Sequence, residues 1–178
     1  MKRLENKTAI VTGGNSGIGK ATAILFAKEG ADLVLCARRK EALDKVAEEC
    51  RGYGVQVVTV KADVSSHEDC SAVVKAAVDT FGKVDILVNN AGIVDKHRPI
   101  TECTDEWWDE IIAIDQSSLF YMMKDTIPHM MAAGKGSIIN VSSIGGVFGN
   151  GGISYSAAKS AALAMTKNVA IQLAPNGI

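Results

Sequence analysis

The sequence predicts an α/β protein with a doubly wound parallel sheet and helices on both faces. Short runs rich in Val, Ile and Leu alternate with stretches of helical periodicity along the whole chain, an order typical of a parallel sheet. The apolar runs lack a polar face, as expected for strands covered on both sides. The chain has 178 residues and shows no linker or internal repeat, so we expect residues 1–178 to form one domain.

The individual elements follow from this alternation. Strands are predicted at residues 8–12, 32–36, 56–61, 86–89 and 137–141. Helices are predicted at residues 18–29, 40–51, 66–81, 105–131 and about 155–173, and Thr104 is the expected N-cap of the fourth helix. The glycine-rich segment 145–152 predicts a flexible loop. Because the sequence stops where the alternation calls for another strand, we expect a longer protein that continues beyond Ile178.

The composition narrows the class of protein. The chain is 47% hydrophobic and has 19 basic against 20 acidic residues, which favours neither nucleic acid nor an anionic membrane as a partner. No apolar run reaches membrane-spanning length, and the N-terminus lacks a signal-peptide core. The scattered cysteines are expected to be reduced, which predicts a cytoplasmic location, and the distant histidines predict no metal site.

A glycine-rich loop lies between the first predicted strand and the first predicted helix. Its sequence is Gly13-Gly14-Asn15-Ser16-Gly17-Ile18-Gly19. Small residues let the backbone turn sharply and approach a pyrophosphate, which the free N–H groups at the helix start can bind. We therefore predict that this loop binds a dinucleotide, and an ordinary strand-to-helix turn is the alternative.

Tyr155 and Lys159 stand four residues apart, a spacing that places both side chains on one face of a helix. A free tyrosine has a pKa of about 10 and is a poor base at neutral pH, but a close ammonium stabilises the phenolate. Such a tyrosine can pass a proton to or from a ketone or alcohol oxygen. The spacing alone is also common on solvated helices, so its meaning depends on the other motifs.

Together, these motifs resemble the short-chain dehydrogenase/reductase family. The resemblance covers essentially the whole chain and rests on the glycine loop, on Asp63-Val64, on Asn89-Asn90-Ala91-Gly92, and on Ser143 with Tyr155 and Lys159. It implies a Rossmann-type sheet that binds a nicotinamide dinucleotide. Asp63 and Val64 would face the adenine, and Asn90, Ala91 and Gly92 would line the cofactor groove.

The resemblance also implies a chemistry. Tyr155 would be the general acid/base and would also contact the cofactor. Lys159 would lower the pKa of Tyr155 and bind the nicotinamide ribose. Ser143 would orient the substrate oxygen, with Ser142 as the alternative. The expected reaction is hydride transfer between the nicotinamide and a carbonyl or secondary alcohol. In the family, two helices form a subunit interface, which implies a homodimer or homotetramer here.

The end of the second predicted strand bears on the choice of cofactor. The family places an acidic residue there when the ribose 2′-hydroxyl is bound, whereas this chain has Ala37 followed by Arg38 and Arg39. A guanidinium binds a 2′-phosphate that a carboxylate would repel. We predict that NADP(H) is preferred and that NAD(H) remains possible; the alternative is a solvated basic turn.

One position departs from the family pattern. Where the family carries an asparagine that holds a water near the lysine, this chain has Asp115. Asp115 would take that place in the catalytic set and could still accept hydrogen bonds. A carboxylate there would partly neutralise the effect of Lys159 on Tyr155, which predicts a slower enzyme or a more alkaline optimum; alternatively, Asp115 is merely tolerated beside water. A catalytically weak dinucleotide sensor or scaffold, or an inactive fragment of an enzyme, is the alternative function. The sequence does not identify the substrate.

Overall fold

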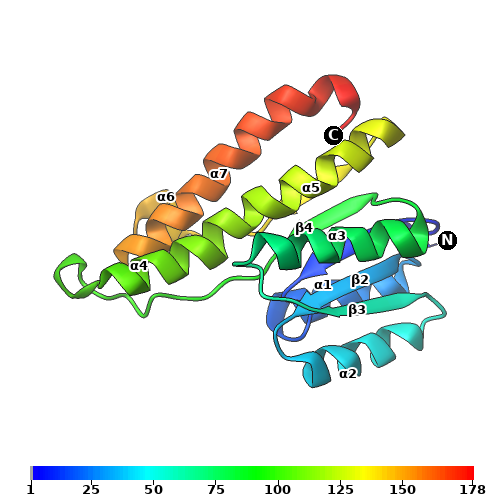
Figure 1. Cartoon of the computed structure of the whole chain (residues 1–178), viewed down its shortest axis with the longest axis horizontal. Coiled ribbons are helices and arrows are strands. Elements are labelled where there is room, and N and C mark those ends of the chain that lie inside the picture. Colours follow the sequence, from blue (N-terminus) through cyan, green and yellow to red (C-terminus); the bar gives the residue numbers. More distant parts are fainter. Residues whose placement is uncertain (1) are drawn as a thin grey trace.

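The computed structural model describes residues 2–178 and shows a sheet with helices on both sides (Figure 1). Five parallel strands lie in the order β3-β2-β1-β4-β5. They are β1 Thr8–Thr12, β2 Asp32–Ala37, β3 Val57–Lys61, β4 Ile86–Asn89 and β5 Ser137–Asn140. Val11 of β1 pairs with Leu35 of β2 and with Val88 of β4, so β1 is central. The predicted fold class is confirmed.

Two sets of helices cover the two faces of the sheet. One set is α1 (Gly17–Lys28) and α2 (Lys40–Arg51), and the other is α3 (His67–Phe81), α5 (Ser118–Ala133) and α7 (Ile153–Leu173). Neighbouring residues of one strand serve opposite faces: Ile10 joins the core beneath α3 and α5, whereas Ala9 and Val11 join the core beneath α1 and α2. The central strands β1, β2 and β4 are therefore largely apolar on both faces.

The helical region before β5 differs from the prediction of one helix over 105–131. The chain forms α4 (Asp105–Ile112), then a π-helical turn (Ala113–Ser117), then α5. Thr104 caps α4 as expected, because its side chain accepts the Trp107 N–H. A π turn places an extra residue in the helix and is frequent at functional sites. Here it carries Asp115, whose exposed fraction is 0%.

The glycine-rich segment 145–152 is not a plain flexible loop, contrary to its composition. It contains the short helix α6 (Gly145–Phe148), which packs against α7. The Ser160 hydroxyl of α7 donates to the Gly146 carbonyl at 2.7 Å. The high glycine content predicts a mobile loop, because the composition of a segment does not reveal its contacts with distant parts of the chain. The other element boundaries agree with the prediction to within two residues.

The strand order fixes where a ligand can bind. The chain winds outward to β3 on one side of β1 and then outward to β5 on the other side, so the order switches between β1 and β4. In such sheets the ligand crevice lies at the carboxyl ends of the strands at this point. Within residues 2–178, none of the helices combines the length and apolar character needed to cross a bilayer.

Candidate functional site

A cavity of about 320 Å³ lies at the carboxyl ends of the central strands. It is built from the loops that follow β1, β2, β3 and β4. Its lining comprises Gly13, Asn15, Ser16, Ala37, Arg38, Arg39, Ala62, Asp63, Val64, Asn90, Ala91, Gly92, Ile93 and Ile114. Most of the predicted cofactor residues are therefore brought together, although they come from four separate parts of the sequence.

The glycine loop is held against β4 by Thr12. The Thr12 hydroxyl accepts the N–H groups of Asn90 at 2.9 Å and Ala91 at 3.0 Å. The Asn90 amide in turn donates to the Thr12 carbonyl at 2.9 Å. Gly19 lies so close to the Gly13 carbonyl that any β-carbon would overlap it. This close packing leaves exposed backbone beside the cavity, which suits the phosphates of a dinucleotide.

Two arginines line the cavity at the end of β2. Arg38 Nη1 lies 4.0 Å from Asp63 Oδ2. With its amide turned to accept, Asn15 places its oxygen 2.9 Å from Arg39 Nη2 and 3.2 Å from Arg39 Nε. Burial works to raise the pKa of Asp63, but hydrogen bonds from Ser65 and the charge of Arg38 hold it below the ordinary value. Both guanidiniums thus stand at the cavity wall with partners that a bound anion can replace.

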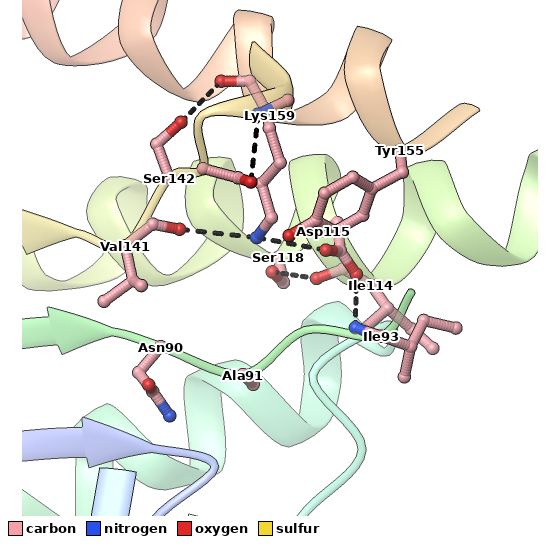
Figure 2. A network of polar contacts seen from close by, with 12 residues as sticks. Asn90, Ala91, Ile93, Ile114, Asp115, Ser118, Val141, Ser142, Tyr155 and Lys159 are labelled. Atoms are coloured by element: carbon pink, nitrogen blue, oxygen red, sulfur yellow. Dashed lines mark hydrogen bonds and ion pairs between the residues drawn. The ribbon is translucent and has the colours of Figure 1, made fainter. Parts of the chain in front are cut away.

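A second cavity of about 510 Å³ adjoins the first and contains the predicted catalytic pair. It is lined by Ile18, Asn90, Gly92, Ile93, Val94, Asp115, Val141, Ser142, Tyr155 and Lys159. Tyr155 and Lys159 project from α7 toward the strand ends, and the Lys159 Nζ lies 5.6 Å from the centre of the Tyr155 ring (Figure 2). Asn90 and Gly92 line both cavities, so the two spaces meet at the loop after β4.

The Lys159 ammonium is enclosed by oxygen atoms. It lies 3.0 Å from Asp115 Oδ2 and donates to the Val141 carbonyl at 3.3 Å (Figure 2). The other Asp115 oxygen accepts the Ile93 N–H at 2.8 Å. Burial raises the pKa of the Asp115 carboxyl above its ordinary value, and Lys159 and the Ile93 N–H oppose this only partly. The π turn is what brings a carboxylate to a position next to the buried lysine.

The structure separates the two candidate serines. The Ser142 hydroxyl donates to the Lys159 carbonyl at 2.8 Å and so fastens the strand end to α7. The Ser143 hydroxyl accepts the Gly145 N–H at 3.1 Å, which leaves its own proton free to donate. Ser142 lines the second cavity, whereas Ser143 is not among the lining residues. A β-carbon placed on Gly145 would lie 3.4 Å from the Tyr155 ring and 3.5 Å from the Ser143 hydroxyl, so both side chains flank this glycine.

The remaining predicted residues lie in the glycine loop and the first turn of α1. Gly17 begins α1 with φ of +55°, Gly19 packs on the glycine loop, and Ile18 lines the second cavity. Asp95 was assigned no role from the sequence, and it has an exposed fraction of 3%. Only its position shortly after the Asn90-Ala91-Gly92 loop hints at a role, because its partners lie almost sixty residues away.

Comparisons with known proteins agree with this geometry. The short chain dehydrogenase family matches residues 7–178. Over 177 residues the chain is 40% identical to 3beta-hydroxysteroid dehydrogenase 2 of Eggerthella lenta, covering 98% of this chain and 68% of that protein. It is 38% identical to the 3-oxoacyl-acyl-carrier-protein reductase FabG of Thermotoga maritima, covering 99% of this chain and 72% of that protein.

Solved structures show the same fold. The structure of NAD+-bound xylitol dehydrogenase superposes with a TM-score of 0.95 at 32% identity, over 99% of this chain and 68% of that chain. Carveol dehydrogenase from Mycobacterium avium in complex with NAD gives a TM-score of 0.94 at 27% identity, over 99% of this chain and 69% of that chain.

Proposed function

Because this chain belongs to the short-chain dehydrogenase/reductase family, whose members act on alcohol and carbonyl groups, we propose that it is an NADP(H)-dependent oxidoreductase with Tyr155 as the general acid/base. The observation that carries this proposal is the buried Lys159 ammonium, held 5.6 Å from the Tyr155 ring centre at a cavity that adjoins the dinucleotide groove. A protein that only bound a dinucleotide would need no proton donor at that place.

The residues of the chain divide the chemistry between them. A bound nicotinamide supplies or accepts the hydride. In the reducing direction, the Tyr155 hydroxyl donates its proton to the carbonyl oxygen, and the positive charge of Lys159 stabilises the phenolate that results. The Ser143 hydroxyl donates a hydrogen bond to the same oxygen and keeps it facing Tyr155. In the oxidising direction, the phenolate takes the proton of the alcohol.

The preference for NADP(H) rests on the wall at the end of β2. Ala37 stands there without a charge, and Arg38 and Arg39 line the cavity beside it. The Asn15 contact holds Arg39 over the glycine loop, where its guanidinium can form a bidentate pair with a 2′-phosphate. Arg38 is shared with Asp63 at 4.0 Å, so Arg39 is the stronger candidate for the phosphate contact.

A turnover assay tests the proposal. The purified protein should oxidise NADPH in the presence of at least one compound from a panel of ketones, steroids and 3-oxoacyl thioesters. Tyr155→Phe should lower kcat by about 10²–10⁴-fold, with the dissociation constant for NADPH unchanged because the ring remains. If Tyr155→Phe keeps wild-type turnover, the assigned acid/base is wrong. Tight NADPH binding without any turnover would instead favour a sensor.

Cofactor preference has its own test. Titration with NADPH and NADH in parallel should give a ratio of affinities that favours NADPH. Arg39→Ala should reduce that ratio by about tenfold, and Arg38→Ala should reduce it less. An unchanged ratio in Arg39→Ala would show that the basic residues form a solvated turn.

We also infer the assembly and the location from surface features. Phe120 on α5 and Ile171 on α7 are apolar side chains with exposed fractions of 51% and 79%, and a homodimer or homotetramer through these two helices would bury them. The cysteines in residues 2–178 are all free thiols, which suits a reducing compartment such as the cytoplasm. Light scattering and cell fractionation check these two inferences.

A further inference from the structure

A buried carboxylate holds the start of the catalytic helix from outside that helix. Asp95 lies in the loop after β4 and is 3% exposed. Its Oδ1 accepts the Gly152 N–H at 3.0 Å and the His97 N–H at 3.2 Å. Its Oδ2 accepts the Tyr155 N–H at 3.0 Å and the Ser154 hydroxyl at 3.1 Å. The carboxylate therefore binds both its own loop and the first turn of α7.

Helix α7 has no cap of its own. Its N-cap residue is Gly152, no side chain of the helix caps the first turn, and that turn contains no acidic residue. The first N–H groups of a helix have no partner within the helix and favour a negative charge. Asp95 supplies that charge across the chain. Burial works to raise the pKa of Asp95, but bonds from Tyr155, His97, Ser154 and Gly152 hold it below the ordinary value.

Gly152 is matched to this contact. A β-carbon at Gly152 would overlap the Asp95 carboxylate. The φ of Gly152 is −69°, a value that any residue adopts without strain. Glycine is therefore required here for the approach of Asp95 and not for its backbone conformation, which makes the two residues a pair.

The same loop is fastened at a second point. Two residues before Asp95, the Ile93 N–H donates to Asp115 at 2.8 Å, and Ile93 lines both cavities. The cofactor wall is thus tied to the π turn through Ile93 and to the start of α7 through Asp95. The Tyr155 N–H that Asp95 binds belongs to the residue whose phenol enters the second cavity. Together these bonds set the separation between the cofactor groove and the phenol.

We propose that Asp95 is a positioning residue for the reaction. By capping α7 from the loop after β4, its carboxylate fixes Tyr155 relative to the cofactor groove. This contact requires that Gly152 has no side chain. The role rests on the proposed function, because it acts through Tyr155. Misplacement of a reacting group by about 1 Å costs about 10²-fold in rate, so the loss of this cap should appear in kcat more than in cofactor binding.

The test uses two substitutions and their combination. Asp95→Ala should lower kcat by about 100-fold and leave the dissociation constant for NADPH within about threefold of wild type. Asp95→Asn keeps one acceptor oxygen and should fall between Asp95→Ala and wild type. Gly152→Ala should lower kcat because its methyl group displaces the carboxylate. In Asp95→Ala with Gly152→Ala that clash no longer exists, so the double variant should be no slower than Asp95→Ala alone.

Asp85→Asn is the matched control. Asp85 is a similarly buried carboxylate that accepts a backbone N–H, from Thr8 at 2.9 Å, but it lies at the far end of the sheet. The Asp85→Asn variant should be less stable than wild type and should have the same kcat. The proposal is overturned if Asp95→Ala keeps kcat within about twofold of wild type. It is also overturned if the fold-losses of kcat from Asp95→Ala and Gly152→Ala multiply in the double variant, or if Asp85→Asn lowers kcat as much as Asp95→Asn does.

Hydrogen exchange separates this proposal from the proposed function. In Asp95→Ala the N–H groups of Gly152 and Tyr155 should exchange faster with solvent than in wild type, while those of α5 keep their protection. Unchanged exchange at both sites would overturn the role of Asp95 even in an active enzyme. A wild-type protein that shows no turnover would sink the oxidoreductase function, and the exchange measurement would still decide whether Asp95 holds α7.

Discussion

Each end of the sheet holds a buried aspartate beside a lysine, but the two carboxylates differ in how well they are satisfied. At the amino end, Asp85 accepts the Thr8 N–H and lies 2.8 Å from Lys83 and 3.5 Å from Lys7. At the carboxyl end, Asp115 lies 3.0 Å from one lysine and accepts one N–H. Asp85 thus has two half-exposed cations, whereas Asp115 has a single buried cation, Lys159, which belongs to the proposed catalytic site.

The pKa shifts of the two carboxyls follow from these partners. Burial works to raise the pKa of Asp85, but the bonds from Lys83 and Thr8 outweigh it and leave the pKa below its ordinary value of 3.8. Burial dominates at Asp115, so its pKa lies above that value. Asp115 is more deeply buried than Asp85 and has fewer partners, and both differences raise its pKa relative to that of Asp85. A buried carboxylate with too few partners, such as Asp115, is typical of a functional site. The Asp85 carboxylate, which has more partners, contributes to stability.

The largest effect should come from Lys159→Met, which breaks the pair at the catalytic end. It leaves the Asp115 carboxylate buried without a cation, which costs about 3–5 kcal/mol of stability at neutral pH. It should also lower kcat by about 10²–10⁴-fold, because the phenolate loses its neighbouring charge. Adding Asp115→Asn should restore the melting temperature and leave kcat low. Recovery of both would show that Lys159 acts only as a counterion.

At the amino end, Asp85→Asn should affect stability alone. It removes one acceptor from Thr8 and weakens two ion pairs, which should cost about 1–3 kcal/mol. The folded pKa of Asp85 is lowered, so its contribution is present above about pH 4 and is lost as the pH falls through the folded value. The difference in Tm from wild type should therefore shrink in acid. A clear loss of kcat at neutral pH would contradict the separation of the two ends.

The smallest and most specific effect is expected for Asp115→Asn. Asparagine can still accept the Ile93 N–H, but it carries no charge to neutralise Lys159. Activity near neutrality should therefore rise severalfold, and the acid limb of the plot of kcat against pH should move to lower pH. The raised pKa of Asp115 means that its charge destabilises the fold increasingly as the pH rises through that value. Relative to Asp115→Asn, wild type should gain stability in acid, opposite to Asp85. An unchanged pH profile would show that Asp115 is merely tolerated.

Most of the fold was predictable because the strands are rich in Val, Ile and Leu and alternate in order with segments of helical periodicity. That Gly13, Asp63 and Asn90 line one cavity was predictable for the same reason, since each follows a recognisable strand. The π turn and the cap by Asp95 were not predictable. A π turn changes the register of a helix without changing its composition, and the partners of Asp95 lie on a helix that only tertiary packing brings near.

The π turn also bears on how this chain tolerates length changes. Removing one residue from Ala113–Ser117 would let α4 and α5 merge into a regular helix. The π turn takes up its extra residue within one turn, so α5 would keep nearly the same orientation on the sheet, while the bulge that presents Asp115 to Lys159 would be lost. A single deletion in this stretch should therefore disturb the surroundings of Lys159 more than the packing of α5 on the sheet.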